Sequence, residues 1–502
     1  MSVHWPIIRR SLLTPRRIGI VDDQRSWRDI ELVIGALHLA SEIERRSNSK
    51  TVGVMLPTTG LFPMAALAGW MLGRTLVPLN YLLKKDELRY VVRDCETDIV
   101  VTVQPMLDMV GELPDSVDIL KVEDVSFKGL PEPRWPAHRK PDDLATLLYT
   151  SGTSGKPKGV MLTHGNLTEN IRQCCEWVDF GRKDVILGVL PQFHSFGFTV
   201  LTLLPLTVGC KVIYSARFTP TKIIKLFRKH NPTAFIGLPS MYNALMSVKE
   251  AKAEDLASLR YTVSGGEPLS DAVFDRFKER FDIKIHEGYG LTETSPVTNW
   301  CRPFEFKRGS VGRALPRVDE RIVDVESGRV LGAGKEGEVR IKGPNVMQGY
   351  FKLEEETRNA FDEDGYFRTG DMGRFDEDGH LSITGRIKEM LIIGGENVFP
   401  REIEEVLDKH ETVEASGVIG VPDESRGETP LAFVQTKEDA EFDAKALRSW
   451  CREHLAGYKV PREIRHIDEM PRNPTGKIMR RELAEKLKEE PAKEQKQEAG
   501  SS

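Results

Sequence analysis

Short apolar runs alternate with amphipathic segments from about residue 51 to residue 281. The runs that predict strands are 51–56, 76–78, 98–103, 234–238 and 261–264. The segments that predict helices between and after them include 84–95, 222–230, 240–248 and 270–281. Alternation of strands with amphipathic helices is typical of a layered α/β domain.

The pattern changes in the later part of the chain. From about residue 309 to 383 there are many glycines, short strands and turn pairs such as Asp364-Gly365 and Asp378-Gly379, which predict a β-rich subdomain. Composition shifts again near 385–396. Beyond it we expect a helix, two strands and a helix at 401–409, 414–421, 430–436 and 443–455. That order predicts a small α+β domain.

Size and composition point to a soluble globular protein of at least two domains. The chain has 502 residues, of which 40% are hydrophobic and 29% charged. The net charge of −5 gives no reason to expect nucleic acid as a partner. The tail 486–502 is charged and favours frayed helix or disorder.

Cysteine spacing and the N-terminal sequence bear on location. Cysteines at 95, 174, 175, 210, 301 and 451 form no CxxC pair, which favours reduced thiols in a cytosolic protein. The N-terminus is polar and basic, without the continuous apolar core of a secretory signal. We therefore expect a cytoplasmic protein, with peripheral membrane contact left open.

The most informative motif is the loop Tyr149-Thr-Ser-Gly-Thr-Ser-Gly-Lys-Pro-Lys-Gly159. Apolar runs on both sides predict a glycine-rich connection between two strands. Backbone N–H groups, hydroxyls and Lys156 or Lys158 can together hold a polyphosphate. A nucleoside-triphosphatase P-loop does not fit, because Pro157 follows Lys156 and a strand follows Lys158. A solvated surface loop is the alternative.

A second motif is Glu287-Gly-Tyr-Gly-Leu-Thr-Glu-Thr294, which follows a strand expected at 283–285. An aromatic ring between two glycines can stack on a flat base. A carboxylate near phosphates usually needs a divalent cation, so Glu293 is a candidate Mg²⁺ ligand. A turn capped by a threonine explains the same residues about equally well.

Three more positions carry candidate chemistry. Asp371, in Phe367-Arg-Thr-Gly-Asp371, suits a ribose diol, or it caps a turn. Arg386 stands at the composition break and could equally be a surface arginine. Lys477, in Pro474-Thr-Gly-Lys477, is placed on a turn to deliver one charge, although an exposed lysine is the commoner fate.

These segments, in this order, resemble the adenylate-forming superfamily of acyl-CoA synthetases, luciferases and nonribosomal-peptide adenylation domains. The resemblance runs from about residue 15 to 485. Further matching segments are Gly337-Glu-Val, Gly385-Arg-Ile-Lys388 and Gly394-Gly-Glu-Asn-Val-Phe-Pro400. Agreement at so many ordered sites is not chance.

The resemblance implies a two-step reaction: an acid and ATP give an acyl-adenylate and pyrophosphate, and a thiol then displaces AMP. It implies the catalytic residues Lys477, Thr292 and His194, with Thr292 at the α-phosphate, and Mg²⁺ at Glu293. The implied contacts with the β- and γ-phosphates of ATP are Thr150, Ser151, Gly152, Thr153, Ser154, Gly155 and Lys158. The implied adenine contacts are Gly266, Glu267, Pro268, Glu287, Gly288 and Tyr289, and the implied ribose contacts are Asp371 and Arg386.

The resemblance also implies the domain organisation. An AMP-binding domain would occupy 1–385, a hinge 386–388, a mobile C-terminal lid domain 389–485 and a disordered tail 486–502. Rotation about Lys388 would let Lys477 leave the site and a thiol enter, because one geometry cannot serve both steps. Gly394 and Gly395 would then face the thiol channel.

The acid is the least determined feature. The segment 191–198 (Pro-Gln-Phe-His-Ser-Phe-Gly-Phe) looks like the acyl-pocket segment of fatty-acyl and acyl-carrier-protein synthetases. The acyl-pocket candidates are Phe193, His194, Tyr242, Gly265 and Gly290. The apolar run 199–206 could wall an acyl tunnel or simply be a core helix. We expect a medium or long fatty acid, with an aryl acid open.

Two signals disagree on the thiol. The His194-Ser-Phe-Gly197 segment leans towards acyl-carrier-protein synthetases, and the 394–400 segment leans towards CoA ligases. CoA, the commoner acceptor, is our expectation for the co-substrate beside ATP. We also keep a hypothesis from a different functional class. In it the protein is a non-catalytic acyl-nucleotide binder, or an adenylating protein that serves a carrier protein.

Overall fold

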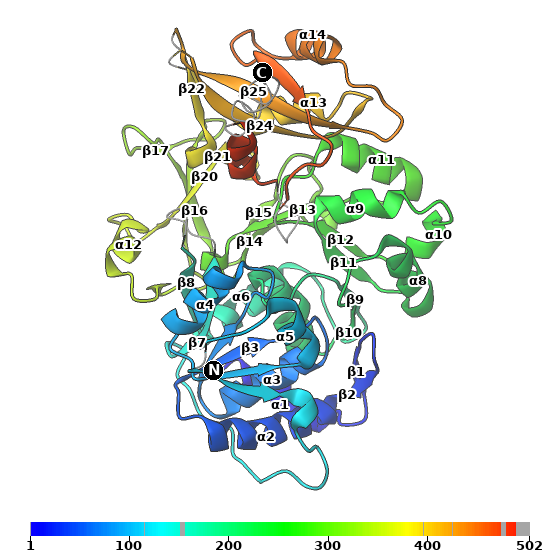
Figure 1. Cartoon of the computed structure of the whole chain (residues 1–502), viewed down its shortest axis with the longest axis vertical. Helices are drawn as coiled ribbons and strands as arrows, with labels where there is room; N and C mark the ends of the chain where they lie inside the picture. The colour runs from blue at the N-terminus through cyan, green and yellow to red at the C-terminus, as the bar shows by residue number, and fades with distance from the viewer. Residues whose placement is uncertain are drawn as a thin grey trace, which may run out of the picture. The chain divides into compact units, whose positions relative to one another are not determined.

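A computed structural model describes residues 2–114, 116–150, 156–394, 396–423, 425–472 and 478–487. The chain divides into two compact units. The first comprises Met1–Gly266, Arg280–Glu320 and Arg340–Thr369. The second comprises Glu267–Glu279, Arg321–Val339 and Gly370–Ser502. Figure 1 labels many of the elements named below.

The first unit contains a nine-stranded sheet. Its strands, in sheet order, are β15 (Arg313–Ala314), β14 (Val297–Trp300), β13 (His286–Gly290), β12 (Tyr261–Ser264), β11 (Ala234–Gly237), β9 (Val185–Gly188), β10 (Lys211–Tyr214), β1 (Ile18–Val21) and β2 (Ser26–Arg28). Pairing is parallel from β13 to β1 and antiparallel at both edges. The central strands are short apolar runs, as parallel strands covered on both faces must be.

A seven-stranded sheet forms the other half of this unit. Its strands, in sheet order, are β19 (Gly349–Tyr350), β8 (Lys158–Thr163), β7 (Leu144–Thr150), β4 (Thr75–Pro78), β3 (Thr51–Met55), β5 (Ile99–Thr102) and β6 (Asp118–Lys121). Strands β7 and β8 are antiparallel and join through the glycine-rich loop. Strand β19 then pairs antiparallel with β8. A distant segment is thereby placed beside the end of that loop.

Helices pack on these sheets. They are α1 (His4–Leu13), α2 (Asp29–Arg46), α3 (Leu61–Met71), α4 (Lys85–Asp94), α5 (Gln104–Val110), α6 (His164–Trp177), α7 (Leu204–Val208), α8 (Pro220–His230), α9 (Pro239–Met246), α10 (Ala253–Leu256) and α12 (Glu354–Asn359). Helix α3 is apolar all round and buried from Phe62 to Met71, where it packs on β3, β4 and α2. No helix among the described residues is long and apolar enough to cross a membrane.

The glycine-rich segment beyond residue 309 forms a five-stranded sheet. Its strands, in sheet order, are β17 (Val330–Leu331), β16 (Asp319–Val323), β18 (Gly337–Lys342), β20 (Phe367–Phe375) and β21 (Leu381–Arg386). Strands β20 and β21 form an antiparallel hairpin in which Asp371 lies opposite Arg386. The predicted β-rich subdomain is confirmed.

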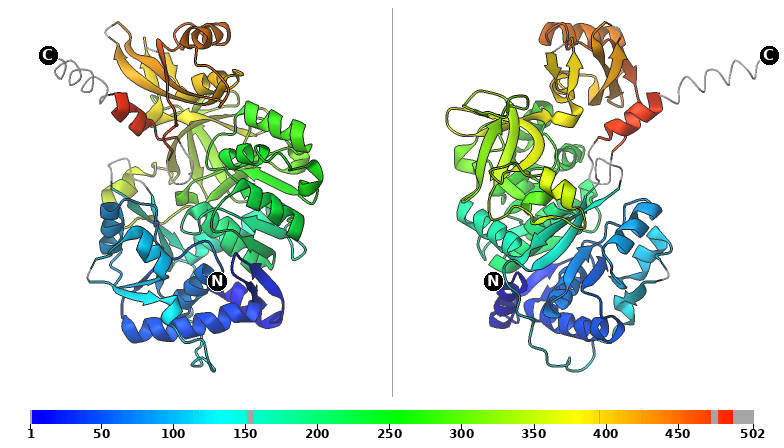
Figure 2. Two further views of the ribbon diagram at one scale, coloured as in Figure 1. Left: turned by 45° about the vertical axis from the view of Figure 1, so that its right-hand side comes forward. Right: turned by 90° about the vertical axis from the view of Figure 1, so that its left-hand side faces the viewer.

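The C-terminal part of the second unit is a small α+β layer. Its strands are β22 (Leu391–Ile393), β23 (Glu396–Val398), β24 (Val413–Asp423), β25 (Gly427–Thr436) and β26 (Glu463–His466), and its helices are α13 (Pro400–Leu407) and α14 (Ala444–His454). The long antiparallel pair of β24 and β25 is orange in Figure 2. Ile403 and Leu407 of α13 pack with Leu447 and Cys451 of α14 in one apolar cluster. Helix α11 (Asp271–Phe281) begins in another segment of the second unit.

The α/β class and the α+β C-terminal layer were predicted correctly, and most predicted boundaries agree within two residues. One strand differs: the expected strand at 283–285 is displaced, because the motif residues 286–290 themselves form β13. The domain boundaries at 385, 388 and 485, and the mobility of the lid, stay predictions. The tail beyond residue 487 lies outside the described residues.

Candidate active site

The phosphate-loop candidate is anchored by a β-hairpin. Thr150, the last residue of β7, lies opposite Lys158, the first residue of β8. Lys158 Nζ lies 5.3 Å from the ring centroid of Tyr350, and Lys156 Nζ lies 5.5 Å from that of Tyr90. Both lysines are thus held at the base of the loop by aromatic faces. The predicted contacts Ser151, Gly152, Thr153, Ser154 and Gly155 lie outside the described residues.

The magnesium candidate Glu293 lies next to this hairpin. The Tyr350 hydroxyl donates a 2.9 Å hydrogen bond to Oε1 of Glu293. The Met347 N–H donates to the Glu293 carbonyl at 2.7 Å. Burial and the charge of Glu293 raise the pKa of Tyr350, so its hydroxyl stays a donor. Tyr350 therefore contacts both the loop lysine and the candidate metal ligand.

Thr292 begins a short 3₁₀ turn, η3 (Thr292–Thr294). Its hydroxyl donates to the Ser195 hydroxyl at 3.2 Å. Asn345 fixes the turn, since its side-chain amide donates to the Thr294 carbonyl and its own carbonyl accepts from the Ser295 hydroxyl, both at 2.8 Å. This contact brings the predicted α-phosphate residue against the predicted acyl segment.

The acyl segment leads into a π-helix, η2 (Phe196–Leu203). A Cβ on Gly197 would lie 2.1 Å from the Pro191 carbonyl oxygen, so only glycine fits there. Phe198 packs on Phe62 and Trp70 in the core. Part of the apolar run is therefore core, as its composition also allowed, whereas Pro191, His194 and Phe196 of the acyl segment are half-buried.

His194 and Phe193 precede the π-helix. His194 Nδ1 accepts a 3.3 Å hydrogen bond from the Phe196 N–H. Burial lowers the pKa of His194 to about 4, so the imidazole is neutral near pH 7. Phe193 is buried and meets the Tyr81 ring edge-on at 4.8 Å.

Of two further acyl-pocket candidates, Gly265 lies beside the acyl segment and Tyr242 lies in the core. A Cβ on Gly265 would lie 3.2 Å from the Phe196 ring and 3.3 Å from the Gly288 carbonyl oxygen, so these three residues meet. Tyr242 is fully buried, and its hydroxyl donates to the carbonyls of Phe235 and Val263. Both carbonyls belong to core strands, β11 and β12. A role for Tyr242 in the acyl pocket therefore stays a prediction.

The adenine candidates lie around β13. Glu287 is buried and forms a 2.5 Å ion pair with Arg308. Gly288 and Tyr289 follow on the strand. Gly290, the last residue of the strand, is exposed. A Cβ at this position would lie 1.9 Å from the Pro296 carbonyl oxygen, so only glycine fits. Gly266 has a φ of 80° and is the last residue of the first unit's segment 1–266. Glu267 and Pro268 begin the segment 267–279, which belongs to the second unit.

The ribose candidates of the second unit are paired with each other. Arg386 Nε lies 2.7 Å from Asp371 Oδ1, and the two residues are cross-strand neighbours on β20 and β21. Asp371 is buried, whereas the Arg386 side chain is 48% exposed. One carboxylate and one guanidinium at the edge of a hairpin can hold a diol.

The hinge candidate Lys388 lies in a 3₁₀ turn, η5 (Ile387–Glu389). Glu389 of that turn pairs with Arg480 at 2.7 Å, and Arg480 also pairs with Glu404 of α13 at 2.6 Å. Arg480 therefore ties the hinge turn to the helix and to the C-terminal segment. Gly394 adopts φ of 61°, and its N–H donates to the Arg426 carbonyl at 2.8 Å. Lys477 and Gly395 lie outside the described residues.

Sequence reasoning assigned no role to four residues whose side chains bond to the candidate site residues or to the turn that carries them: Tyr350, Ser195, Asn345 and Arg308. Gly349-Tyr350 repeats the glycine–aromatic pair of Gly288-Tyr289, which was a usable signal. Asn345 and Arg308 carry no local signal, because their partners are far away in the sequence.

Comparison with known proteins assigns the chain to a family. Residues 14–351 match the family described as AMP-binding enzyme, and residues 402–477 match the AMP-binding enzyme C-terminal domain. The chain belongs to this family of adenylate-forming enzymes, as the resemblance predicted.

Similar proteins differ in their acids. The chain is 34% identical over 506 residues to the long-chain-fatty-acid–CoA ligase of Bacillus subtilis (strain 168), covering 91% of this chain and 89% of the relative. It is 32% identical over 486 residues to a feruloyl-CoA synthase of Amycolatopsis sp, covering 95% and 97%. The crystal structure of ATP-bound MatB from Rhodopseudomonas palustris is similar, with a TM-score of 0.88, 32% identity, and coverage of 97% of this chain and 99% of MatB.

Proposed function

We propose that this enzyme activates a carboxylic acid with ATP as an acyl-adenylate and transfers the acyl group to CoA. The acid we favour is a medium or long fatty acid. One observation carries the proposal: the 3.2 Å contact between Thr292 and Ser195 joins the phosphate-side turn to the acyl-side segment. An acyl-adenylate needs such a junction, because its carboxyl carbon is joined through oxygen to the α-phosphorus.

In the first half-reaction a carboxylate oxygen attacks the α-phosphorus, a new oxygen–phosphorus bond forms, and pyrophosphate leaves. Attack by an anion on an anion requires hydrogen-bond donors and positive charge already in place. Thr292 would supply a hydroxyl donor at the α-phosphate, and Lys158 would supply charge at the loop. Lys477 would complete the set.

The remaining nucleotide contacts are proposed from the family resemblance. Asp371 and Arg386 would bind the ribose, and the β13 residues Glu287–Tyr289 would border the adenine. Magnesium would be held by Glu293 together with phosphate oxygens. The donor chemistry fits, because a carboxylate oriented by the Tyr350 hydroxyl is the hard oxygen ligand that Mg²⁺ prefers. When bound, the ion supplies charge neutralisation at the phosphates.

In the second half-reaction the CoA thiol attacks the acyl carbon, a carbon–sulfur bond forms, and AMP leaves. His194 is neutral and half-buried, so its part would be to shape the acyl entrance beside Phe196 rather than to carry charge. Rotation about Lys388 would open the thiol side between the two steps. Similarity to the fatty-acid–CoA ligase over nine-tenths of the chain supports CoA as the acceptor.

A second acid class has support of its own. Similarity to the feruloyl-CoA synthase covers almost the whole chain, which favours an aryl acid. Similarity to the long-chain-fatty-acid–CoA ligase supports the fatty acid, whereas Val200, Leu201 and Leu203 of η2 belong to the apolar core and do not distinguish the two acids. An acyl chain is extended and apolar, whereas a phenolic acid needs a partner for its hydroxyl.

A direct test measures thioester formation by mass spectrometry with ATP, Mg²⁺ and CoA across acetate, octanoate, palmitate, benzoate, coumarate and ferulate. We expect the largest kcat/KM for octanoate or palmitate. A maximum at ferulate or coumarate would replace the fatty acid by an aryl acid. A parallel reaction with holo acyl carrier protein tests the acceptor, and a thioester formed with that protein but not with CoA would overturn the CoA assignment.

A further inference from the structure

Two turns of this chain have almost the same sequence and the same backbone hydrogen bonds. They are Phe361-Asp-Glu-Asp-Gly-Tyr366 and Phe375-Asp-Glu-Asp-Gly-His380. In the first, the N–H groups of Asp364 and Tyr366 donate to Asp362 Oδ1 at 3.1 and 2.9 Å. In the second, those of Asp378 and His380 donate to Asp376 Oδ1, both at 2.9 Å. The turn therefore explains the first aspartate of each copy, Asp362 and Asp376, and His380 is what distinguishes the second copy.

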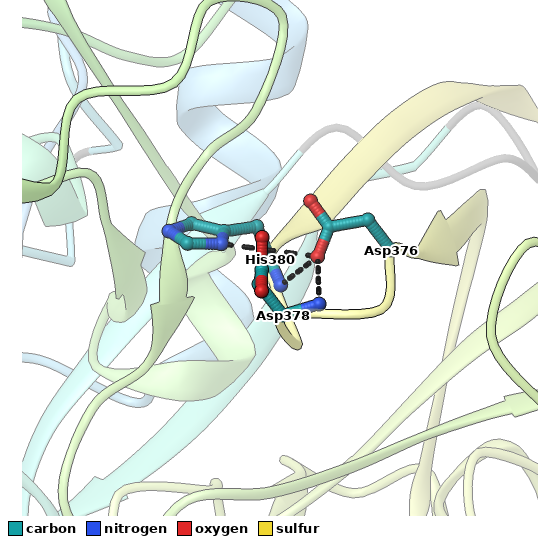
Figure 3. A group of neighbouring side chains, drawn as sticks. All are labelled: Asp376, Asp378 and His380. Atoms are coloured by element: carbon teal, nitrogen blue, oxygen red, sulfur yellow. Dashed lines mark hydrogen bonds and ion pairs between the residues drawn. The ribbon is translucent and has the colours of Figure 1, made fainter.

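His380 is not explained by the turn. Its side chain is 9% exposed, and neither ring nitrogen has a hydrogen-bond partner among the described residues. Nδ1 lies 3.8 Å from Asp376 Oδ1. Figure 3 shows the imidazole ring facing that carboxylate. At the equivalent position Tyr366 directs its hydroxyl to Asp319. A buried imidazole aimed at a carboxylate, but too far from it for a hydrogen bond, leaves room for a third atom.

Three ligand atoms converge there. One each from Asp376, Asp378 and His380 lie within 4.8 Å of one another. An ion centred in an equilateral triangle of that largest size would lie about 2.8 Å from each atom, and zinc bonds to nitrogen and oxygen are about 2.0 to 2.2 Å. Movement of each ligand atom by less than about 1 Å would bring all three to bonding distance from the ion. Two adjacent carboxylates also repel each other, and a cation between them removes that repulsion.

We propose that Asp376, Asp378 and His380 form a binding site for a divalent transition-metal ion of the zinc type. One imidazole nitrogen and two carboxylate oxygens suit Zn²⁺, which accepts both ligand types, better than Mg²⁺ or Ca²⁺, which prefer oxygen alone. Asp378 is exposed, so water completes the coordination and the ion can exchange. The site does not depend on the proposed ligase reaction.

The site closes the β20–β21 hairpin. Phe375 and Leu381 are the first pair after the turn, and Asp371 and Arg386 are paired farther along the same ladder. A bound ion would tie the two strands together at the turn. It would thereby stabilise the hairpin that carries the ribose candidates.

The test is calorimetric titration of the full-length, EDTA-treated protein with Zn²⁺ alone, without ATP or Mg²⁺. The wild type should show a binding event that is absent in His380→Tyr, a substitution that copies the twin turn. Asp378→Asn, an exposed substitution that keeps the fold, should weaken the affinity about tenfold or more. Asp364→Asn, the matched acid of the twin turn, should bind as the wild type does.

A second readout is thermal unfolding. Zn²⁺ should raise the Tm of the wild type and of Asp364→Asn, raise the Tm of Asp378→Asn by less at the same zinc concentration, and leave the Tm of His380→Tyr unchanged. Zinc bound elsewhere, for example by cysteines, would act equally in all four proteins. Equal binding by wild type and His380→Tyr, or no binding by the wild type, would overturn the proposal and leave His380 as an ion-pair partner of Asp376.

Discussion

The Tyr350 hydroxyl donates a 2.9 Å hydrogen bond to Glu293, and the same tyrosine ring lies 5.3 Å from Lys158 Nζ. One side chain thus connects the candidate metal ligand with the base of the candidate phosphate loop. Tyr350 reaches this position because β19 pairs with β8. Its function in the proposed site is to orient the Glu293 carboxylate.

Tyr350→Phe tests that function. The ring over Lys158 is kept, but the hydrogen bond to Glu293 is lost. Groups that orient a metal ligand typically contribute about 10- to 100-fold to metal affinity or activity. We expect the Mg²⁺ concentration for half-maximal pyrophosphate release to rise by about tenfold. Tyr366→Phe, which removes another tyrosine–carboxylate hydrogen bond, is the control, and equal Mg²⁺ dependence in both variants would contradict the function.

Asp371→Asn tests the ribose assignment. The substitution removes the carboxylate charge that would accept from the ribose hydroxyls and that holds Arg386 in place. A charge-assisted contact of this kind contributes about 1.5 to 3 kcal/mol. The KM for ATP should therefore rise by about tenfold or more, while the fold persists because water can solvate the half-exposed Arg386. Steady-state kinetics at saturating acid measure the change, with Asp364→Asn as the control. An unchanged KM for ATP would make the ion pair purely structural.

The pH dependence of activity tests the state of His194. Burial lowers the pKa of His194 to about 4, so the imidazole loses its proton as pH rises through about 4 and is neutral above about pH 5. His194→Asn should lower kcat/KM for the acid without changing the shape of the pH profile between about pH 6 and 9. An acidic limb near the ordinary histidine pKa of about 6.5, present in the wild type and lost in the variant, would instead indicate acid–base catalysis.

Arg480→Ala tests the contact between the hinge turn and α13. It leaves the buried Glu404 without its guanidinium, and breaking such a pair costs about 3 to 5 kcal/mol. Arg480→Lys should give an intermediate loss, because lysine lacks the planar fork. Denaturant unfolding measures both. Arg481→Ala, whose side chain is 79% exposed, should change stability by less than about 1 kcal/mol. Equal effects of the two alanine variants would contradict the assigned role of Arg480.

The regular elements could be predicted because local pattern determines them. The helix expected at 270–281 is α11 (Asp271–Phe281), and the strand expected at 261–264 is β12. Alternating apolar runs encode these elements without any distant partner. The π-helix at 196–203 was not predicted, because its apolar run has no period that distinguishes it from an ordinary buried helix.

The site was predictable only where a motif lies in one continuous segment. Glu293 and Asp371 stand inside short motifs and were selected from them. Tyr350 hydrogen-bonds a residue 57 positions away, and Asn345 bonds one 51 positions away, so neither contact is visible in a local window. Ser195 was part of a quoted segment, but its contact with Thr292 spans 97 positions.

The central claim is adenylation of an acid, and acid-dependent pyrophosphate release tests it most directly. The purified enzyme is assayed with ATP and Mg²⁺, with and without palmitate, octanoate or ferulate, and then with CoA added. We predict release that requires an acid and increases with CoA. Release that CoA does not change would point to another acceptor. No release with any acid would contradict the enzymatic account itself.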